Sequence, residues 1–299
     1  MPRYRGSSLK IKAKRHIISY LLILPALVFL VLFVFYPIFY SLMLSMQRYR
    51  LGFKTRQFIG LANYKTLFAT TDFWNSMQIT GVYTVIVMVV SIVLGLFLAV
   101  LISYRKKTEM FWQVIFFLPV AATMAAMSIV WRFILDQNFG FFNALLQAFG
   151  MRGTDWLQNP DTAFSVVTMI NIWTNAGYTM VFFIAGLANI SGELYESAAL
   201  DGSNKLQDFL YISFPLLSPT TLFIVIIMTV RALASFDTIK VLTNGGPLQT
   251  TEILSLLLYR EAFQFFNIGF ASSIAVVFFV LTLVLAIVQL KFDKRVHYQ

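Results

Sequence analysis

The chain has 299 residues, of which 59% are hydrophobic and 12% are charged, and its formal net charge is +10. Soluble domains carry about 25% charged residues, so this composition, with a mean hydropathy of +0.75, indicates an integral membrane protein. The absence of cysteine excludes disulfides, thiolate metal sites and cysteine nucleophiles. The basic residues are spread over two tails and a loop, which favours contact with membrane lipid and excludes nucleic acid as a partner.

Six apolar windows are long enough to cross about 30 Å of hydrocarbon, which takes roughly 20 helical residues. Apart from Arg132 and Arg231, no window carries Lys, Arg, Asp or Glu deep in its middle. The first window is too long for the apolar core of a signal peptide, so we expect it to be retained. The sequence therefore predicts an all-α, polytopic membrane protein with six transmembrane helices, at about 17–44, 79–103, 113–134, 163–190, 209–236 and 267–290.

The distribution of Lys and Arg predicts the orientation of the chain. With the N-terminus in the cytoplasm, thirteen Lys and Arg residues lie on the inner side and nine on the outer side. The loop between Arg48 and Lys65 opposes this bias, because it places five positive charges outside. We expect both termini to be cytoplasmic. The predicted divisions are a basic cytoplasmic tail (1–16), a first helix with its outer loop (17–74), a transmembrane core (75–290) and a second basic cytoplasmic tail (291–299).

A segment at 193–217, ELYESAALDGSNKLQDFLYISFPLL, lies on the predicted cytoplasmic side between two apolar windows. Ser191 suits the N-cap of a helix, and Glu196 lies near its first turn, where a carboxylate complements the helix dipole. Gly202 interrupts the helix-forming residues, and Pro215 suits the first turn of another helix. The segment therefore predicts two short helices that meet at a bend and form an ordered protrusion.

The spacing in this segment is similar to the EAA motif, E-A-A-x3-G-x9-I-x-L-P, of permease subunits of bacterial ATP-binding-cassette importers. Five of the seven specified positions match, and the two departures are Ser197 and Phe214. The resemblance implies a cytoplasmic coupling helix that fits a groove on the ATPase and carries its motion into the membrane. The residues to which the coupling role transfers are Glu196, Ser197, Ala198, Gly202, Ile212 and Pro215.

The resemblance extends over most of the chain. FIGLANYKTLF (58–68), FFLPVAATMAAMSIVWRFI (116–134), LTNGGPLQTTEIL (242–254) and the ending FDKRVHYQ look like the first of the two permeases in carbohydrate-uptake importers. That group includes the maltose and glycerol-3-phosphate systems. The resemblance implies the type I ABC importer permease fold in the bacterial plasma (inner) membrane. It also implies a second homologous permease, two ABC ATPase subunits and an extracytoplasmic solute-binding protein as partners.

No G-x-x-x-x-G-K-[ST] stretch occurs in the sequence, so any ATP hydrolysis must take place on a partner. We therefore expect that the chain is not an enzyme, has no catalytic residues and holds no cofactor, with ATP and Mg bound by the partner subunits. Its two histidines, His16 and His297, lie at opposite ends, and we expect no metal site. A secondary transporter is a remote alternative, because such carriers usually place acids or His inside the membrane.

The fourth window is the most polar. Asn171, Asn175 and Tyr178 recur at i, i+4 and i+7 and share one helix face, with Trp173 beside them. One interpretation is hydrogen bonding between helices. The other is a polar and aromatic wall of a translocation path, because amides match sugar hydroxyls and an aromatic face stacks on a sugar ring. The sequence leaves both open.

Arg231 is the most costly residue to bury in the fifth window. It can pair with Asp237, reach the membrane surface, or meet an anionic substrate, and we expect a structural partner. The predicted substrate is a sugar or oligosaccharide, with glycerol-3-phosphate or a related phosphodiester as the alternative. In the outer loop at 238–266, TNGGP predicts a turn. The apolar run after it predicts an interfacial helix, which the resemblance makes a surface for the solute-binding protein.

Overall fold

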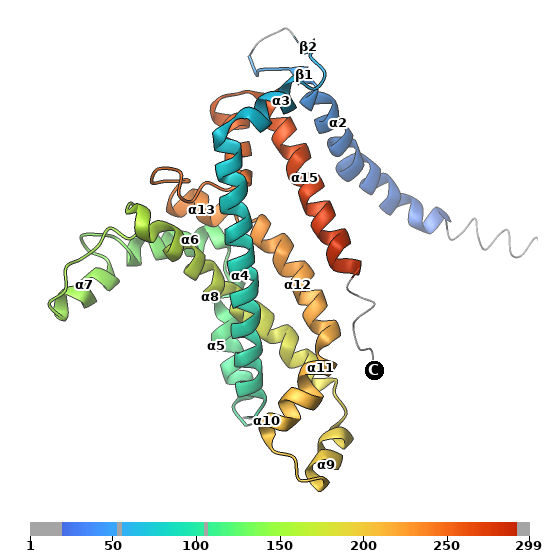
Figure 1. Cartoon of the computed structure of the whole chain (residues 1–299), viewed down its shortest axis with the longest axis vertical. Helices are drawn as coiled ribbons and strands as arrows, with labels where there is room; N and C mark the ends of the chain where they lie inside the picture. The colour runs from blue at the N-terminus through green and yellow to red at the C-terminus, as the bar shows by residue number, and fades with distance from the viewer. Residues whose placement is uncertain (1–19, 53–55, 105–106, 292–299) are drawn as a thin grey trace, which may run out of the picture. The chain divides into compact units, whose positions relative to one another are not determined.

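A computed structural model describes residues 20–52, 56–104 and 107–291. The predicted basic tails therefore lie outside the described residues, apart from Lys291. The described chain is mostly helical, as predicted, and carries one two-stranded ribbon (Figure 1). Its helices, with η marking π-helices, are η1 (Val31–Phe35), α2 (Tyr36–Ser45), α3 (Ala62–Ala69), α4 (Thr71–Ser103), α5 (Glu109–Ala121), α6 (Met124–Ile134), α7 (Phe141–Ala148), α8 (Pro160–Ala188), α9 (Gly192–Leu200), α10 (Lys205–Gln207), η2 (Asp208–Ser213), α11 (Phe214–Leu216), α12 (Ser218–Leu233), α13 (Phe236–Leu242), α14 (Leu254–Tyr259), η3 (Arg260–Gln264) and α15 (Ile268–Lys291).

Four helical stretches in the described part of the chain are long and apolar enough to cross a membrane. They are Tyr20–Ser45, Thr71–Ser103, Ser218–Leu242 and Ile268–Lys291, and they match the first, second, fifth and sixth predicted windows. The bent pair of α5 and α6 makes a fifth if it is counted as one span. Helix α8 matches the fourth window and has 29 residues. It is long enough to cross a membrane, but its polar side chains make it less apolar than these four stretches.

The third window, predicted as one transmembrane helix over 113–134, is not one continuous helix. The structure divides it into α5 and α6, which meet at an angle of 96°. Ala122 and Thr123 have extended backbones between the two helices, and the Thr123 hydroxyl accepts a hydrogen bond from the Ala126 backbone N–H. That bond caps the start of α6. Pro119 lies inside α5 near its end, where it removes one backbone donor. Uniform hydropathy across the window hid this break.

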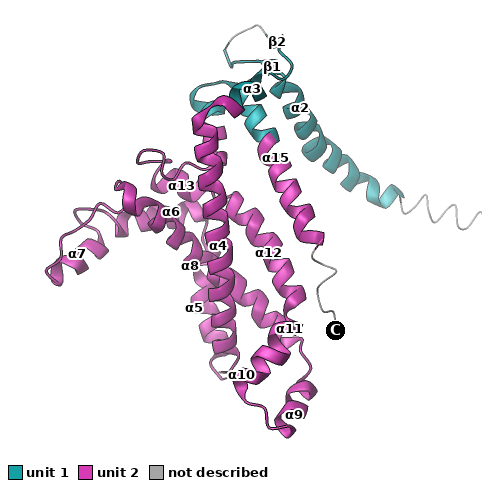
Figure 2. Ribbon diagram, in the orientation of Figure 1, with its two compact units in different colours: residues 1–67, 261–276 teal, residues 68–260, 277–299 magenta. Residues whose placement is uncertain are grey.

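The chain forms two compact units, residues 1–67 with 261–276 and residues 68–260 with 277–299, so that α15 contributes to both (Figure 2). In the first unit, strands β1 (Gln47–Arg48) and β2 (Gln57–Phe58) pair antiparallel. The Asn63 amide donates to the backbone oxygens of Ser45 (2.7 Å) and Gln47 (3.0 Å). Gly269 of α15 packs directly on the Gln47 carbonyl, and its N–H donates to the Tyr49 oxygen at 3.0 Å. These contacts hold the ribbon to the start of α15.

The core of the second unit is the packing of α8 against α4, with further contacts from α5 and α12. Gly95 of α4 faces Thr179 of α8 so closely that a Cβ on Gly95 would overlap the threonine side chain. The Thr179 hydroxyl donates to the Ser91 backbone oxygen at 2.8 Å. On another side of α8, Gly177 lies against the Phe116 carbonyl of α5, again with no room for a Cβ. Small residues thus let three helix backbones approach closely, as is usual in membrane bundles.

The apolar run after the TNGGP turn differs from its prediction. It forms α14, but Leu254, Leu256 and Leu257 are buried rather than exposed at an interface. The Leu254 N–H donates to the Thr80 hydroxyl of α4 at 2.9 Å. Glu252, fully buried, forms an ion pair with Arg260 at 2.9 Å. The run is therefore part of the core of the second unit, and its apolar residues are explained by packing.

Candidate functional site

A cavity of about 200 Å³ lies among α6, α8, α12 and α13. At about 30 Å³ for each water in the liquid, this is the volume of a small cluster of waters. The cavity therefore has room for part of a small polar solute rather than for a long chain. It is lined by Met124, Asn171, Asn175, Arg231, Ala234, Ser235, Asp237 and Thr238.

Helix α8 supplies the two asparagines. It begins at Pro160 with Asn159 as N-cap, whose side-chain oxygen accepts from the Asp161 N–H at 3.0 Å. Asn171 and Asn175 are buried, at 1% and 3% exposure. Their amide nitrogens donate to the backbone oxygens four residues earlier, at 3.1 and 2.9 Å. Each donor is thus partly satisfied within α8, which fixes the direction of both amides beside the cavity.

Arg231 of α12 is held on two sides by α8. Its Nε donates to the Asn175 side-chain oxygen at 3.1 Å, and its guanidinium carbon lies 4.3 Å from the centre of the Tyr178 ring. The hydrogen bond joins two helices, as the packing interpretation predicts, while both partners also line the cavity. The expectation of a structural partner is thus confirmed for Arg231, but that partner is Asn175 rather than Asp237. Among the described residues, no ion pair joins Arg231 to Asp237.

Two further side chains shape the chemistry of the cavity. Asp237, which is exposed, gives it one negative charge to set against Arg231. Thr238 is buried, and its hydroxyl finds no hydrogen-bond partner among the described residues. A buried hydroxyl without a partner costs about 1 to 3 kcal/mol, so Thr238 is an energetically costly residue beside the cavity.

Trp173 does not belong to the cavity. It is exposed on another face of α8, and its ring packs edge-to-face on Trp131 of α6, with 5.4 Å between the ring centroids. Tyr178 also lies outside the lining and reaches the cavity only through Arg231. The structure therefore brings Asn171, Asn175 and Arg231 together at one cavity, places Tyr178 behind them, and separates Trp173 from them.

The segment at 193–217, which was predicted to be cytoplasmic and to form two short helices, does form two short helices, α9 and α10. Ser191 caps α9 by accepting from the Glu193 N–H at 3.4 Å, and Asn204 caps α10 in a capping box with Gln207. Between them Gly202 has a φ of +80°, which confirms the predicted bend. In Figure 1 α9 lies at the bottom of the view and α10 lies above it, both below the lower end of α12.

The side of this segment that faces away from the rest of the second unit is exposed. Glu196 and Ser197 are exposed, and Ala198 is half-buried. Leu200, at the end of α9, and Tyr211, in η2, are 90% and 77% exposed.

The inner side of the segment is tied to its neighbours. Ile212 and Pro215 are half-buried, with Pro215 in the first turn of α11 as predicted. The hydroxyl groups of Tyr195 and Ser213 hydrogen-bond at 2.9 Å and join α9 to η2. The Lys205 ammonium lies 5.0 Å from the centre of the Tyr104 ring at the end of α4. Partial burial, followed by the nearby Asp208 carboxylate, raises the pKa of Tyr104 above its ordinary value. The segment is thus connected to both α4 and the helix that leads to the cavity.

Residues 91–298 match the family described as binding-protein-dependent transport system inner membrane component. The chain belongs to this family. It is 37% identical over 283 residues to a probable ABC transporter permease protein of Bacillus subtilis, covering 93% of this chain and 96% of the relative. It is 31% identical over 288 residues to the trehalose/maltose transport system permease protein of Thermococcus litoralis, covering 95% and 96%.

The permease fold is also found in a solved structure. A bacterial alginate ABC transporter, crystallised with its alginate pentasaccharide-bound periplasmic protein, contains a chain of similar fold. The TM-score is 0.85 at 23% sequence identity, covering 95% of this permease and 96% of that chain. The likeness places this permease in the type I ABC importer fold.

Sequence reasoning missed several residues of the cavity in this permease. Ser235 and Thr238 follow Arg231 at i+4 and i+7, so the helical period that found the α8 stripe also marks them. Met124 had no such signal, because it enters the cavity only through the break between α5 and α6. In the described part of the permease, no group of three or more His, Asp and Glu side chains could hold a metal ion.

Proposed function

We propose that this permease forms half of the translocation pathway of an ATP-driven, binding-protein-dependent importer of a sugar or oligosaccharide. The observation that carries the proposal is the cavity among α6, α8, α12 and α13. It places amide, hydroxyl, guanidinium and carboxylate groups together inside an otherwise apolar protein. Asn171, Asn175 and Arg231 lie within proposed membrane spans, where polar groups are usually functional. The carbohydrate named in the trehalose/maltose relative supports the substrate class.

The mixture of groups in the cavity favours a neutral, hydroxyl-rich solute. A hydroxyl group both donates and accepts hydrogen bonds, so adjacent hydroxyls can accept from Arg231 and donate to Asp237. The two asparagine side chains that line the cavity provide further partners. One positive and one negative side chain balance the formal charge of the lining, so a neutral solute enters without leaving either charge alone.

Glycerol-3-phosphate or a related phosphodiester is the second candidate. The observation that favours it is Arg231, the only cation among the residues that line the cavity in the described chain. Guanidinium groups bind phosphate oxygens with a fixed fork of donors. Asp237 opposes this reading, because a carboxylate on the same cavity repels an anion.

We assign the coupling role to α9 and the turn at Gly202. The exposed Glu196, Ser197 and Leu200 form the surface that would meet the partner ATPase. The bond between Tyr195 and Ser213 would transmit its movement into α11 and α12. This arrangement supports partnership with two ABC ATPase subunits that bind ATP and Mg, a second homologous permease and an extracytoplasmic solute-binding protein. The transmembrane path would be shared with that second permease.

The proposed topology has six spans with both termini in the cytoplasm of a bacterial cell. Four stretches meet the criteria of length and apolarity in the described chain, and the α5–α6 pair and α8 complete the six. Helix α8 is more polar than the others because it carries the cavity residues. A helix inside a bundle exposes fewer side chains to lipid and can therefore be more polar. Many side chains in the middle of α8 are buried.

The test compares two substitutions in α8. Asn175→Ala removes a cavity amide, and we expect uptake per assembled complex to fall at least several-fold, since each net hydrogen bond is worth about 0.5 to 1.5 kcal/mol. Thr174→Val is the matched control, because Thr174 is equally buried but donates to Ile170 of its own helix and lies off the cavity. It should leave uptake unchanged.

Both variants are measured for thermal stability in detergent and for uptake by the assembled importer. If Asn175→Ala lowers stability while uptake per assembled complex stays normal, the amide is packing between helices and the cavity is not the substrate path. Transport of labelled maltose, trehalose and glycerol-3-phosphate by the unaltered importer would then separate the two substrate classes.

A further inference from the structure

The two helices that follow α5 carry an apolar surface that nothing in the described chain covers. On α6, Ile129, Val130 and Phe133 are 50%, 48% and 62% exposed. With the exposed Ala126 they stand at i, i+3, i+4 and i+7 and form one stripe. The opposite side of α6 packs on α13 and includes the buried Ser128. This helix is therefore fixed on one side and presents an apolar side outward.

The stripe continues onto α7. Phe141, Leu145 and Phe149 are 65%, 44% and 74% exposed and lie four residues apart. Phe139 and Met151, at 69% and 52% exposure, extend the surface at either end of α7. Isolated exposed apolar residues are ordinary, but a row on each of two successive helices marks a contact with another phase or molecule.

The shape of this arm, residues 124–157, is fixed by one buried side chain. Asn143 is 1% exposed. Its amide nitrogen donates to the backbone oxygens of Asp136, Gln137 and Thr154 at 3.2, 3.1 and 2.9 Å. Its oxygen accepts from the Thr154 N–H and the Trp156 indole, each at 3.0 Å. These five hydrogen bonds of Asn143 fix the position of α7, so its exposed apolar face is also fixed.

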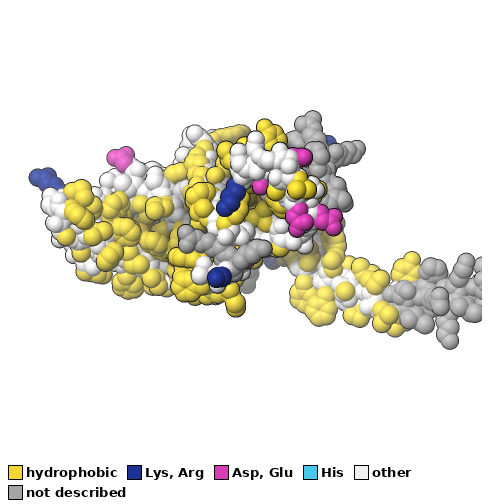
Figure 3. All heavy atoms as spheres, turned by 90° about the horizontal axis from the view of Figure 1, so that it is seen from below, with side chains coloured by type: hydrophobic (Ala, Val, Ile, Leu, Met, Phe, Trp, Pro, Cys, Tyr) yellow, Lys and Arg dark blue, Asp and Glu magenta, His cyan; other side chains and the backbone are white. Residues whose placement is uncertain are grey.

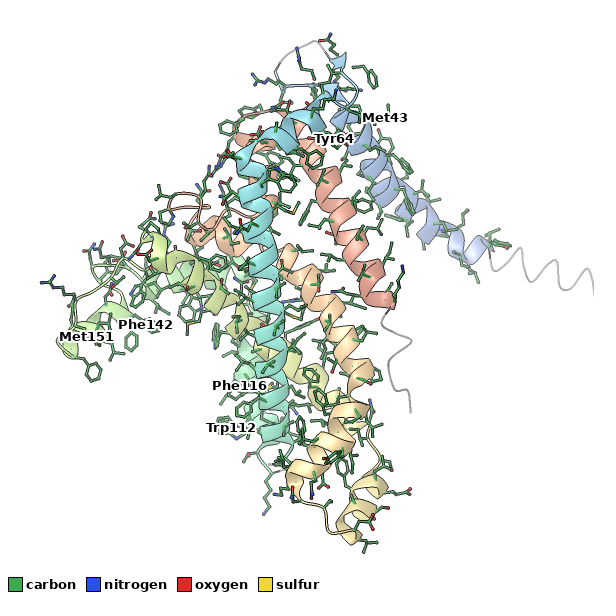
Figure 4. The ribbon with its side chains drawn as sticks, in the orientation of Figure 1. Met43, Tyr64, Trp112, Phe116, Phe142 and Met151 are labelled. Carbon is green, nitrogen blue, oxygen red and sulfur yellow. The ribbon has the colours of Figure 1, made fainter. Side chains whose placement is uncertain are left out.

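The depth of the arm follows from α5. That helix has 13 residues, so it rises about 20 Å, which is less than the roughly 30 Å of a bilayer core. The chain then turns through 96° into α6. With Glu109 at one boundary of the bilayer, α6 would run across the bundle in the half of the bilayer farther from Glu109. Figure 4 shows the arm projecting away from α4, with Phe142 and Met151 on it and Trp112 and Phe116 on α5.

The apolar side chains gather on the side of the arm that a membrane would meet. Figure 3, a view along the bundle from the end that carries α9, shows the projecting arm covered mainly by hydrophobic side chains, with a basic side chain at its tip. Arg132, in the last turn of α6, and Arg152, beyond α7, are both exposed. Basic groups at the ends of an apolar stripe can reach lipid headgroups while the stripe lies among acyl chains.

We propose that the α6–α7 arm is an interfacial lipid-binding element that lies in the leaflet farther from α9, with Phe133, Leu145 and Phe149 among the acyl chains. Lipid is favoured over a docked protein by continuity, because the stripe follows directly from the apolar α5 span. It is also favoured by the exposed Arg132 and Arg152, which can reach anionic headgroups while the stripe lies among acyl chains. The arm would anchor α6, the helix that supplies Met124 to the cavity.

The test uses the absence of cysteine from the chain. Single cysteines at Leu145 and Phe149 are labelled with an environment-sensitive fluorophore in the assembled importer in phosphatidylcholine nanodiscs. Gln147→Cys is the matched control, because Gln147 is exposed on the opposite face of α7. We expect lipids carrying a doxyl group near the headgroup to quench the Leu145 and Phe149 probes at least threefold more than the Gln147 probe. Iodide in solution should show the reverse order.

Three outcomes overturn the proposal. Equal quenching of all three probes by iodide would place the arm in water. Shielding of the Leu145 probe from both quenchers would mean that a partner permease covers the arm. Iodide quenching of that probe that disappears only when solute-binding protein is added would make the arm a protein-docking surface. None of these outcomes depends on which solute the importer carries.

Discussion

The guanidinium carbon of Arg231 lies 4.3 Å from the centre of the Tyr178 ring, while its Nε donates to Asn175 at 3.1 Å. The Tyr178 ring therefore contacts the face of the guanidinium, and the Asn175 side chain bonds its edge. A cation held over an aromatic face is stabilised by about 0.5 to 2 kcal/mol, more as water is removed. The remaining donors of Arg231 are directed by this arrangement and not by a carboxylate.

Arg231→Lys tests this fixed geometry. Lysine keeps the charge but has no planar fork to bond Asn175 and stack on Tyr178 together. We expect uptake per assembled complex to fall roughly two- to tenfold, the equivalent of one net hydrogen bond. Tyr178→Leu should have an effect of similar size. In the double variant the losses should be less than multiplicative, because each single change already breaks the same arrangement. Fully multiplicative losses in uptake would mean that the two residues act independently.

Gly202 at the turn between α9 and α10 offers a second test. Nothing lies within 4 Å of the place its Cβ would take, so only its φ of +80° restricts the residue. Asparagine tolerates this region and valine does not, with a penalty of about 1 to 2 kcal/mol. We expect Gly202→Asn to keep substrate-stimulated ATP hydrolysis and Gly202→Val to lose most of it in an assembled complex.

Gly192→Ala is the control for that pair, because Gly192 also has open space but has no positive φ. It should behave as the unaltered protein. Glu196→Lys reverses the charge on the exposed face of α9 and should also uncouple hydrolysis from uptake. Full coupling in both Gly202→Val and Glu196→Lys would remove α9 from the transmission path.

The proposed orientation is checked by single cysteines at two exposed leucines. Leu200 and Leu248 are 90% and 85% exposed. Leu200 ends α9, before α12 in the chain, and Leu248 lies in the loop after α13, so the two flank the α12–α13 span on opposite sides. A membrane-impermeant maleimide should label Leu200→Cys only from the cytoplasmic side and Leu248→Cys only from outside. Labelling of Leu200→Cys in intact cells would reverse the topology and detach α9 from any cytoplasmic ATPase.

Gly177→Ala tests the close packing of α5 on α8. The added methyl would overlap the Phe116 carbonyl, which belongs to the backbone and has no rotamer with which to avoid it. Overpacking of this kind typically costs about 1 to 3 kcal/mol. Gly81→Ala in α4 is the matched control, with nothing within 4 Å, and it should be neutral or slightly stabilising. Thermal unfolding in detergent measures both, and equal midpoints would show that α5 and α8 are not in close contact.

Much of the fold could be predicted from hydropathy and local signals. Four windows match apolar stretches because long apolar helices are required in a bilayer, and Ser191, Gly202 and Pro215 act within a few residues of themselves. The break at Ala122 and Thr123 could not be predicted, because its surroundings are as apolar as a straight span. The burial of α14 was missed for a similar reason: an apolar run has the same composition at a membrane surface as in a core.

Only the part of the candidate site that lies on a single helix face could be predicted from the sequence. The period of α8 brings Asn171 and Asn175 together, and Arg231 drew attention by its charge. The sequence could not show that Trp173 faces Trp131, or that Tyr178 contacts Arg231 rather than the cavity, since both depend on the neighbouring helices. The unpartnered Thr238 hydroxyl likewise became visible only with the packing around it.

The two residues next to Tyr178 in the sequence fix α8 against its neighbours. Gly177 lies against the backbone of α5, and the Thr179 hydroxyl donates a hydrogen bond to the backbone of α4. Neither contact uses a side chain that points into the cavity. These two contacts are independent of Asn171, so exchanges at Asn171 can alter the preferred solute while the helix keeps its position. Asn175 differs, because it also bonds Arg231 of α12, and its exchange would change both the lining and a contact between helices.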